Sequence, residues 1–303
     1  MTTKGIYHTL VTQLGKLARH NRQGSFRTKD RYYEAVKRFC AYLAVHYHLQ
    51  KLEDISGKHL VSYVFYLQEQ GKSASTIKTD LSAIRFFHDK MSHPRYTLPG
   101  NEELGVALER RRFGQQDRTW TNPEFGKLIG RAMAEEREDY ILALYLARYA
   151  GLRIHECFRT DTAAAERALR ENALTVKGKG GKVRIVPIED ERIPMMLRKL
   201  LAQTERGHKL LVPDGMPTDR AINALELFIY RYRNEVSDKD SDRRLSFHGL
   251  RHTYAAEQYT KLTEDGMSAI DAHYAVSRLL GHERADVTNI YLASVRKRGR
   301  DGE

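Results

Sequence analysis

Four short segments in the second half of the chain bring together basic side chains, histidines and one tyrosine. They read GLRIHE at 151–156, KGKGGK at 177–182, SFHGLRHT at 246–253 and LGH at 280–282, followed by a tyrosine at 291. Glu156 lies three residues after Arg153, so on a helix its carboxylate faces the guanidinium and can hold it. His248 is three residues from Arg251 and four from His252, which places all three on one helical face.

Each segment taken alone also has an ordinary structural interpretation. Arg153 and Glu156 can form a surface ion pair, a turn rich in glycine and lysine is usually solvated, and a single tyrosine is usually a packed ring. The turn is not a nucleotide-binding P-loop, because Val183 follows Lys182 where that motif needs Ser or Thr. The histidines do not match the zincin motif, because Gly249 stands in place of its glutamate. We therefore expect no metal ion and no other cofactor.

Taken together, the segments supply the side chains that one reaction needs. A phosphodiester attacked by a phenol gathers negative charge on its non-bridging oxygens, which two arginines can hold with donors placed in advance. A phenol has a pKa of about 10 and needs a base and nearby cations to attack. The departing 5′-oxygen needs a proton, which a lysine on a hairpin can deliver. The phosphotyrosine conserves the bond energy, so the strand can be resealed without ATP or a metal ion.

A mainly helical fold with one small β-hairpin is expected to carry these segments. Apolar residues three and four apart predict a first helix at 27–47, then helices at 57–70, from 75 to just before Pro94, and at 101–112. In the second half they predict helices at 123–135, 138–150, 190–204, 218–233, 247–261, 267–280 and 286–292. Two β-prone runs at 173–177 and 183–187 flank the glycine-rich turn and predict the hairpin.

The charge distribution favours a polyanion as the partner. The 303 residues carry a net charge of +12, and residues 1–112 hold 19 Lys and Arg against 10 Asp and Glu. Nucleic acid is the natural partner of such a surface, although charge alone does not separate it from a membrane surface. We expect an N-terminal helical domain at 1–112, a linker at 113–119 and a second domain at 120–303. Cys40 and Cys157 are expected to be reduced core residues.

In order and spacing, the segments resemble the motifs of the tyrosine recombinases, also called phage integrases, and most of all their compact Xer-like and mobile-element members. GLR with Glu156 matches the first arginine motif, and GKGGKVRIVP matches the hairpin motif that carries Lys179. HGLRHT matches the motif H-x-L-R-H-T, and LGH is followed nine residues later by Tyr291. The run SASTIKTDLSAIRFFH resembles the family's four-helix core-binding domain. In one departure, residues 160–172 look helical where the family has a strand.

The resemblance implies a C-terminal catalytic domain and a role for each matching residue. The implied catalytic set is Arg153, Lys179, His248, Arg251, His282 and Tyr291, supported by Glu156 and His252. In this set the tyrosine is the nucleophile, the arginines clamp the phosphate and the lysine protonates the leaving 5′-oxygen. The first histidine assists proton transfer and the last one hydrogen-bonds the phosphate. The expected DNA contacts are Lys72, Lys78, Arg85, Arg110, Arg111, Arg112 and Lys182.

The resemblance further implies site-specific recombination of double-stranded DNA at core sites, by a mobile-element integrase or an Xer-like resolution enzyme. Four protomers would form a tetrameric synapse that exchanges strands through a Holliday junction, and an accessory protein that sets direction is a further candidate partner. Two other classes stay open: a type IB topoisomerase, which uses similar residues without a partner protomer, and a non-enzymatic DNA-binding protein. The complete residue set argues against the non-enzymatic class.

Localisation is predicted from what the sequence lacks. No apolar run approaches the roughly 20 residues needed to span a bilayer, and the N-terminus carries no secretory signal pattern. We therefore expect a bacterial cytoplasmic protein that associates with the nucleoid when it is bound to DNA.

Overall fold

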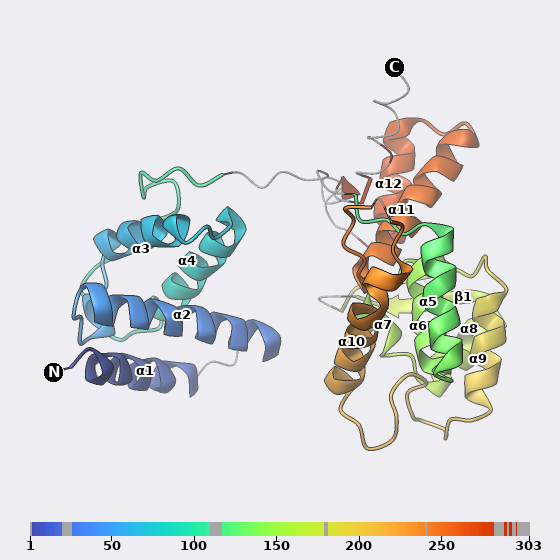
Figure 1. Cartoon of the computed structure of the whole chain (residues 1–303), viewed down its shortest axis with the longest axis horizontal. Coiled ribbons are helices and arrows are strands. Elements are labelled where there is room, and N and C mark those ends of the chain that lie inside the picture. Colours follow the sequence, from blue (N-terminus) through green and yellow to red (C-terminus); the bar gives the residue numbers. More distant parts are fainter. Residues whose placement is uncertain are drawn as a thin grey trace. The chain divides into compact units, whose positions relative to one another are not determined.

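The mainly helical fold with one β-hairpin is confirmed by the computed structural model of the chain (Figure 1). The structure describes residues 2–19, 26–109, 117–178, 181–239, 241–281, 288–289, 291–292 and 295. The chain divides into two compact units, Met1–Arg111 and Arg112–Glu303. Each unit has its own apolar core, and each is described here by itself.

Within its described residues, the first unit contains four α-helices and one short 3-10 helix. Their bounds are α1 Thr3–Arg19, α2 Phe26–His46, η1 Leu52–Asp54, α3 Gly57–Glu69 and α4 Ala74–His88. Helix α1 packs on α2, and α2 packs on α4, so that α2 lies in the middle of the unit. Among the fully buried side chains are Leu10 of α1, Phe39 of α2 and Leu81 of α4.

Two details of the predicted first unit are wrong. The chain is already helical at Thr3, because Ile6, Leu10 and Leu14 recur every fourth residue and are all buried. Residues 101–109 form turns and irregular chain in place of the predicted helix. There Gly105 adopts a left-handed backbone with φ of 63°, which interrupts any helix at that point.

The second unit contains eight helices within its described residues, together with the hairpin. Their bounds are α5 Asn122–Ala134, α6 Glu138–Ala150, α7 Ile154–Cys157, α8 Thr162–Glu171, β1 Ala173–Lys177, β2 Val183–Pro187, α9 Arg192–Leu201, α10 Thr218–Val236, α11 Phe247–Glu264 and α12 Ala269–Leu279. The hairpin pairs antiparallel with Lys177 opposite Val183, and α8 is helical, as the sequence predicted. The helix predicted at 286–292 falls mostly outside the described residues.

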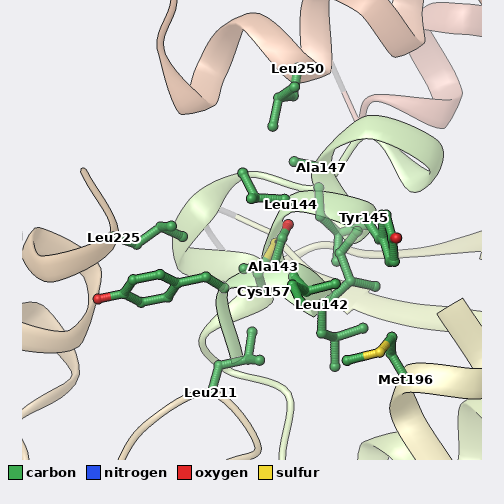
Figure 2. Packing of buried hydrophobic residues seen from close by; sticks show 14 of the residues in the cluster. Leu142, Ala143, Leu144, Tyr145, Ala147, Cys157, Met196, Leu211, Leu225 and Leu250 are labelled. Atoms are coloured by element: carbon green, nitrogen blue, oxygen red, sulfur yellow. The ribbon is translucent and has the colours of Figure 1, made fainter. Parts of the chain in front are cut away.

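Helix α6 forms the centre of the second unit. Nearly every residue from Tyr140 to Ala150 is buried, which is typical of a helix covered on all sides. Figure 2 shows why: Leu225 of α10, Leu250 of α11 and Met196 of α9 approach α6 from different directions. The predicted core thiol Cys157 is buried in this cluster, and neither cysteine of the chain forms a disulfide.

The segment that enters the second unit is fixed to the start of α11. The backbone N–H of Trp120 donates to the hydroxyl of Thr253 at 2.8 Å, and its indole N–H donates to the carbonyl oxygen of Ser246 at 3.0 Å. Gly249 allows this close approach, because a Cβ there would lie 2.4 Å from the carbonyl oxygen of Arg118. The first two turns of α11, which carry the candidate site residues His248, Arg251 and His252, are therefore held from outside.

We predict that Gly249→Ala destabilises the second unit by about 1–3 kcal/mol, because backbone atoms must move to admit the methyl group. Urea unfolding followed by Trp120 fluorescence, with circular dichroism as a second probe, measures the change. Gly130→Ala in α5 is the matched control, because a Cβ there meets no atom within 4 Å and alanine favours the helix. Equal stability of the two variants would contradict the packing argument.

Candidate active site

Arg153 is placed by the end of α6. Gly151 ends that helix with a left-handed φ of 62°, and a Cβ there would lie 2.4 Å from the ring of Tyr254. The chain then turns, and Arg153 becomes the N-cap of the short helix α7. Its guanidinium donates to Glu156 Oε1 at 3.0 Å and its backbone N–H to Oε2 at 2.8 Å, as the spacing of three predicted. The Arg153 side chain keeps 24% of its surface exposed, so it can meet a ligand.

Arg184 is a part of the site that the sequence analysis did not assign. It lies on β2, and its guanidinium grips both oxygens of Glu156, at 2.9 and 2.7 Å. Burial alone would raise the pKa of Glu156, but the hydrogen bonds and charge of Arg184, then the Arg153 backbone and the charge of Arg251, lower it to about 2. The carboxylate therefore stays ionised at neutral pH. The one signal in the sequence was the arginine inside the hairpin motif GKGGKVRIVP.

Arg251 is fully buried on α11. Its two terminal nitrogens donate to the backbone carbonyl oxygens of Gly151 and Leu280, which fixes the plane of the guanidinium. Its Nη1 lies 3.9 Å from Glu156 Oε2. Burial, followed by the positive charge of Arg153, lowers the pKa of Arg251 to about 10, which still leaves it charged at neutral pH. Both predicted phosphate-binding arginines thus share one carboxylate.

Tyr291 lies among the residues of α11 in its own chain. Its hydroxyl is 3.2 Å from His248 Nε2, and its ring lies against the ring of His252 with 4.4 Å between centroids. The Arg251 guanidinium carbon is 5.6 Å from the centre of the tyrosine ring. The phenol is buried in a small apolar cluster that includes Tyr254. The structure therefore brings the predicted nucleophile, one arginine and two histidines together.

Both histidines are neutral at physiological pH. Burial, followed by the charges of Arg251, Arg153 and Arg118, lowers the pKa of His248 to about 4, although part of this side chain is exposed. Burial, followed by the neighbouring His248 and the charges of Arg118 and Arg251, lowers the pKa of His252 to about 3. A neutral imidazole can accept a proton, so His248 is suited to take one from the tyrosine.

Several predicted site residues lie outside the described part of the chain. These are Lys179, His282, Arg110, Arg111 and Arg112. The residues that precede the first two are described: Gly178 packs near Glu156, and Gly281 packs against Arg184.

The remaining predicted DNA contacts differ in their surroundings. Lys72 and Lys182 are exposed. Lys78 Nζ donates to the carbonyl oxygen of Glu109 at 2.8 Å. Arg85 is half-buried and donates to the carbonyl oxygen of Pro99 at 2.7 Å, so it supports the loop after α4.

The described residues contain no group of three or more His, Cys, Asp or Glu side chains that could hold a metal ion. Among the described helices, none is both long and apolar enough to cross a membrane.

Comparison with known proteins places this fold and site in a class. The model of the phage integrase family matches residues 126–298, and the phage integrase N-terminal SAM-like domain matches residues 17–92. The tyrosine recombinase XerD of Halalkalibacterium halodurans is 26% identical over 290 residues, covering 90% of this chain and 89% of the relative.

Two solved structures share the fold. The recombinase XerH bound to a palindromic difH substrate has a TM-score of 0.64 at 18% identity and covers 93% of this chain and 80% of its own. A lambda integrase tetramer on a Holliday junction has a TM-score of 0.62 at 18% identity, covering 92% and 76%.

The fold and the site define a tyrosine recombinase, an enzyme that cleaves DNA through an active-site tyrosine. The chain belongs to the phage integrase family, and site-specific DNA recombination is its activity.

We predict that His252→Phe makes the second unit less sensitive to acid. In the unfolded chain a histidine takes up a proton near pH 6.5, whereas buried His252 does not until about pH 3. The native state therefore loses stability as the pH falls below about 6.5, by about 2 kcal/mol for this residue between pH 7 and 5. Urea unfolding by Trp120 fluorescence at pH 7 and 5 should show that the variant lacks this loss. His248 contributes equally to both proteins, so an identical loss in both would contradict the prediction.

Proposed function

We propose that Tyr291 attacks the scissile phosphorus of a DNA strand and that His248 accepts the phenol proton. The observation that carries this proposal is the 3.2 Å contact between the tyrosine hydroxyl and His248 Nε2, next to Arg251, within one chain. The new bond joins the phenol oxygen to phosphorus, and the bond from phosphorus to the 5′-oxygen breaks. The product is a 3′-phosphotyrosine and a free 5′-hydroxyl. Attack by another 5′-hydroxyl runs the same steps backwards and reseals the strand.

In this mechanism Arg153 and Arg251 hold the non-bridging oxygens of the phosphate. The charge on these oxygens grows in the transition state, where fixed guanidinium donors stabilise it most. Arg153 has exposed surface, whereas Arg251 has none in this structure. The phosphate therefore meets Arg153 first, and contact with Arg251 requires movement of the groups that cover it, Tyr291 among them.

Two further roles follow from the family to which the chain belongs. Lys179 protonates the leaving 5′-oxygen, and His282 donates a hydrogen bond to the phosphate. The residues that precede them support these roles. Gly178 packs near Glu156 and Arg184, and Gly281 packs against Arg184. Glu156 and His252 hold the reacting groups in place, the former through Arg153 and the latter through the tyrosine ring.

The partner in this proposal is double-stranded DNA at specific core sites. Residues 1–112 act as the helical core-binding domain, residues 113–119 as the linker and residues 120–303 as the catalytic domain. Four protomers form the synapse, which is supported by the solved lambda integrase tetramer on a Holliday junction. The protein works in the bacterial cytoplasm on nucleoid DNA, and an accessory protein sets the direction of exchange.

Two cellular tasks fit this activity: insertion and excision of a mobile element, and Xer-like resolution of joined chromosomes or plasmids. The relative named XerD supports the second task. The position of the gene distinguishes them, because an integrase gene lies at the end of its element and a resolution enzyme does not.

We predict that Tyr291→Phe abolishes the covalent protein–DNA adduct on a nicked suicide substrate and leaves DNA affinity within about twofold, since only the reacting hydroxyl is lost. The adduct is measured by denaturing gel electrophoresis and the affinity by a mobility-shift assay. Tyr259→Phe is the matched control, because Tyr259 packs against the same small cluster and should react normally. An adduct formed by the Tyr291 variant would identify another nucleophile.

We predict that DNA affinity falls steeply with salt and that Lys72→Ala lowers the slope of log affinity against log salt by about 1, the value for one lost phosphate contact. Titrations between low and moderate salt give the slope. Lys199→Ala is the control, because that side chain is already paired with Glu138 at 2.5 Å. A slope that is the same for the Lys72 variant and the wild type would remove Lys72 from the DNA interface.

A further inference from the structure

The buried carboxylate of Glu156 faces more positive charge than it can neutralise. Arg153, Arg184 and Arg251 all lie within 3.9 Å of its oxygens. Three positive charges against one negative charge leave two in excess. A phosphodiester carries one negative charge, and attack by a phenolate raises it to two in the transition state. The excess positive charge of the site therefore matches the charge that must be stabilised.

Of the three arginines, Arg184 makes the most complete contact with the carboxylate. It donates one hydrogen bond to each oxygen, at 2.9 and 2.7 Å, which is the bidentate geometry that makes such pairs strong. Arg153 uses a single side-chain hydrogen bond to Oε1, and Arg251 stays 3.9 Å from Oε2. Arg153, part of whose side chain is exposed, consequently retains donors for another anion, whereas Arg184 is committed to Glu156.

The space around Arg184 is shaped for this contact. A Cβ on Gly281 would lie 3.0 Å from Arg184 Cδ, and a Cβ on Gly178 would lie 3.8 Å from its Nη1. Only 10% of the Arg184 side chain is exposed, so it is poorly placed to bind DNA itself. The side chain lies between two glycine backbones and points at a carboxylate with no exposed surface.

We propose that Arg184 is a positioning residue that saturates Glu156 and thereby keeps Arg153 available for the scissile phosphate. Without Arg184, Arg153 is the one side chain that already donates a hydrogen bond to the buried carboxylate. The carboxylate would form a bidentate pair with Arg153 and withdraw that guanidinium from the DNA. The proposal rests on the proposed role of Arg153.

The test compares Arg184→Met with the wild type on three nicked suicide substrates. The first has a normal phosphate, the second a methylphosphonate that lacks one negative oxygen, and the third a sulfur in place of the leaving 5′-oxygen.

On the normal substrate we expect the rate of single-turnover cleavage to fall about 100-fold, a typical effect of losing transition-state charge stabilisation. The protein concentration that gives half-maximal cleavage should stay within about twofold of the wild-type value. On the methylphosphonate the deficit should shrink to about tenfold or less, because less charge must be stabilised. On the sulfur substrate it should remain about 100-fold, because a better leaving group does not replace a phosphate contact.

The double variant Arg184→Met with Glu156→Gln gives a second readout. Because it also removes the carboxylate that withdraws Arg153, cleavage of the normal substrate should recover at least about tenfold over Arg184→Met alone. If Arg184 only stabilised the fold, the second substitution would lower activity further. Arg192→Met is the matched control, because Arg192 makes an equivalent bidentate pair with Asp190 away from the site and its loss should leave all three rates near the wild type.

Three results would overturn the proposal: unchanged cleavage by Arg184→Met, an equal deficit on all three substrates, or rescue by the sulfur substrate alone. The last result would mean that Arg184 positions the acid that protonates the leaving group. If the methionine variant does not fold, Arg184→Lys fills the same space and should show a smaller deficit with the same preference for the methylphosphonate. Failure of the proposed function is seen separately, as a wild-type protein that forms no adduct or a Tyr291→Phe variant that still does.

Discussion

The negative charge of Glu156 is the constraint on which the arrangement of the site depends. A carboxylate with no exposed surface stays ionised only where cations and hydrogen bonds offset the loss of water. Arg153 belongs to the start of α7, Arg184 to β2 and Arg251 to α11, so three separate elements must converge on this one side chain. The ion pairs therefore set the spacing between the end of α6, the hairpin and the second turn of α11. The same spacing brings two guanidinium groups to one place, which is what binding of a phosphate requires.

Close backbone approach is the second condition, and glycine meets it at the points where the elements meet. Gly151 lets the chain leave α6 against the ring of Tyr254, and Gly249 lets the entering segment lie on α11. Gly281 lets the turn after α12 rest on Arg184. Helix α6, covered on all sides, supplies the rigid support for these contacts. A site assembled from several elements can in this way be held together by direct hydrogen bonds.

The sequence predicts what is local and leaves out what depends on distant contacts. The hairpin and the pairing of Arg153 with Glu156 follow from short-range periodicity and spacing, and the structure confirms both. Arg184 and Glu156 lie 28 residues apart in the sequence, so no periodic pattern predicts that they pair. The sequence likewise does not predict that Arg251 is buried against backbone carbonyl oxygens, because this contact depends on how α6 and α12 end.

Errors at the edges of the first unit have the same origin. The segment after α4 has a helical composition, but Arg85 holds it through the carbonyl oxygen of Pro99 and the side chain of Asn101, and Gly105 turns it away. These tertiary contacts outweigh local propensity.

The positive charge proposed to hold the phosphate also acts on the protonation state of His248, the proposed base. Burial, followed by the charges of Arg251 and Arg153, lowers the pKa of His248, so its imidazole remains neutral beside a tyrosine hydroxyl 3.2 Å away. A histidine in ordinary water would be partly protonated near pH 6.5 and would then be unable to accept a proton. The proposed clamp and the proposed base are therefore parts of one electrostatic arrangement, because the two arginines that share Glu156 also lower the pKa of His248.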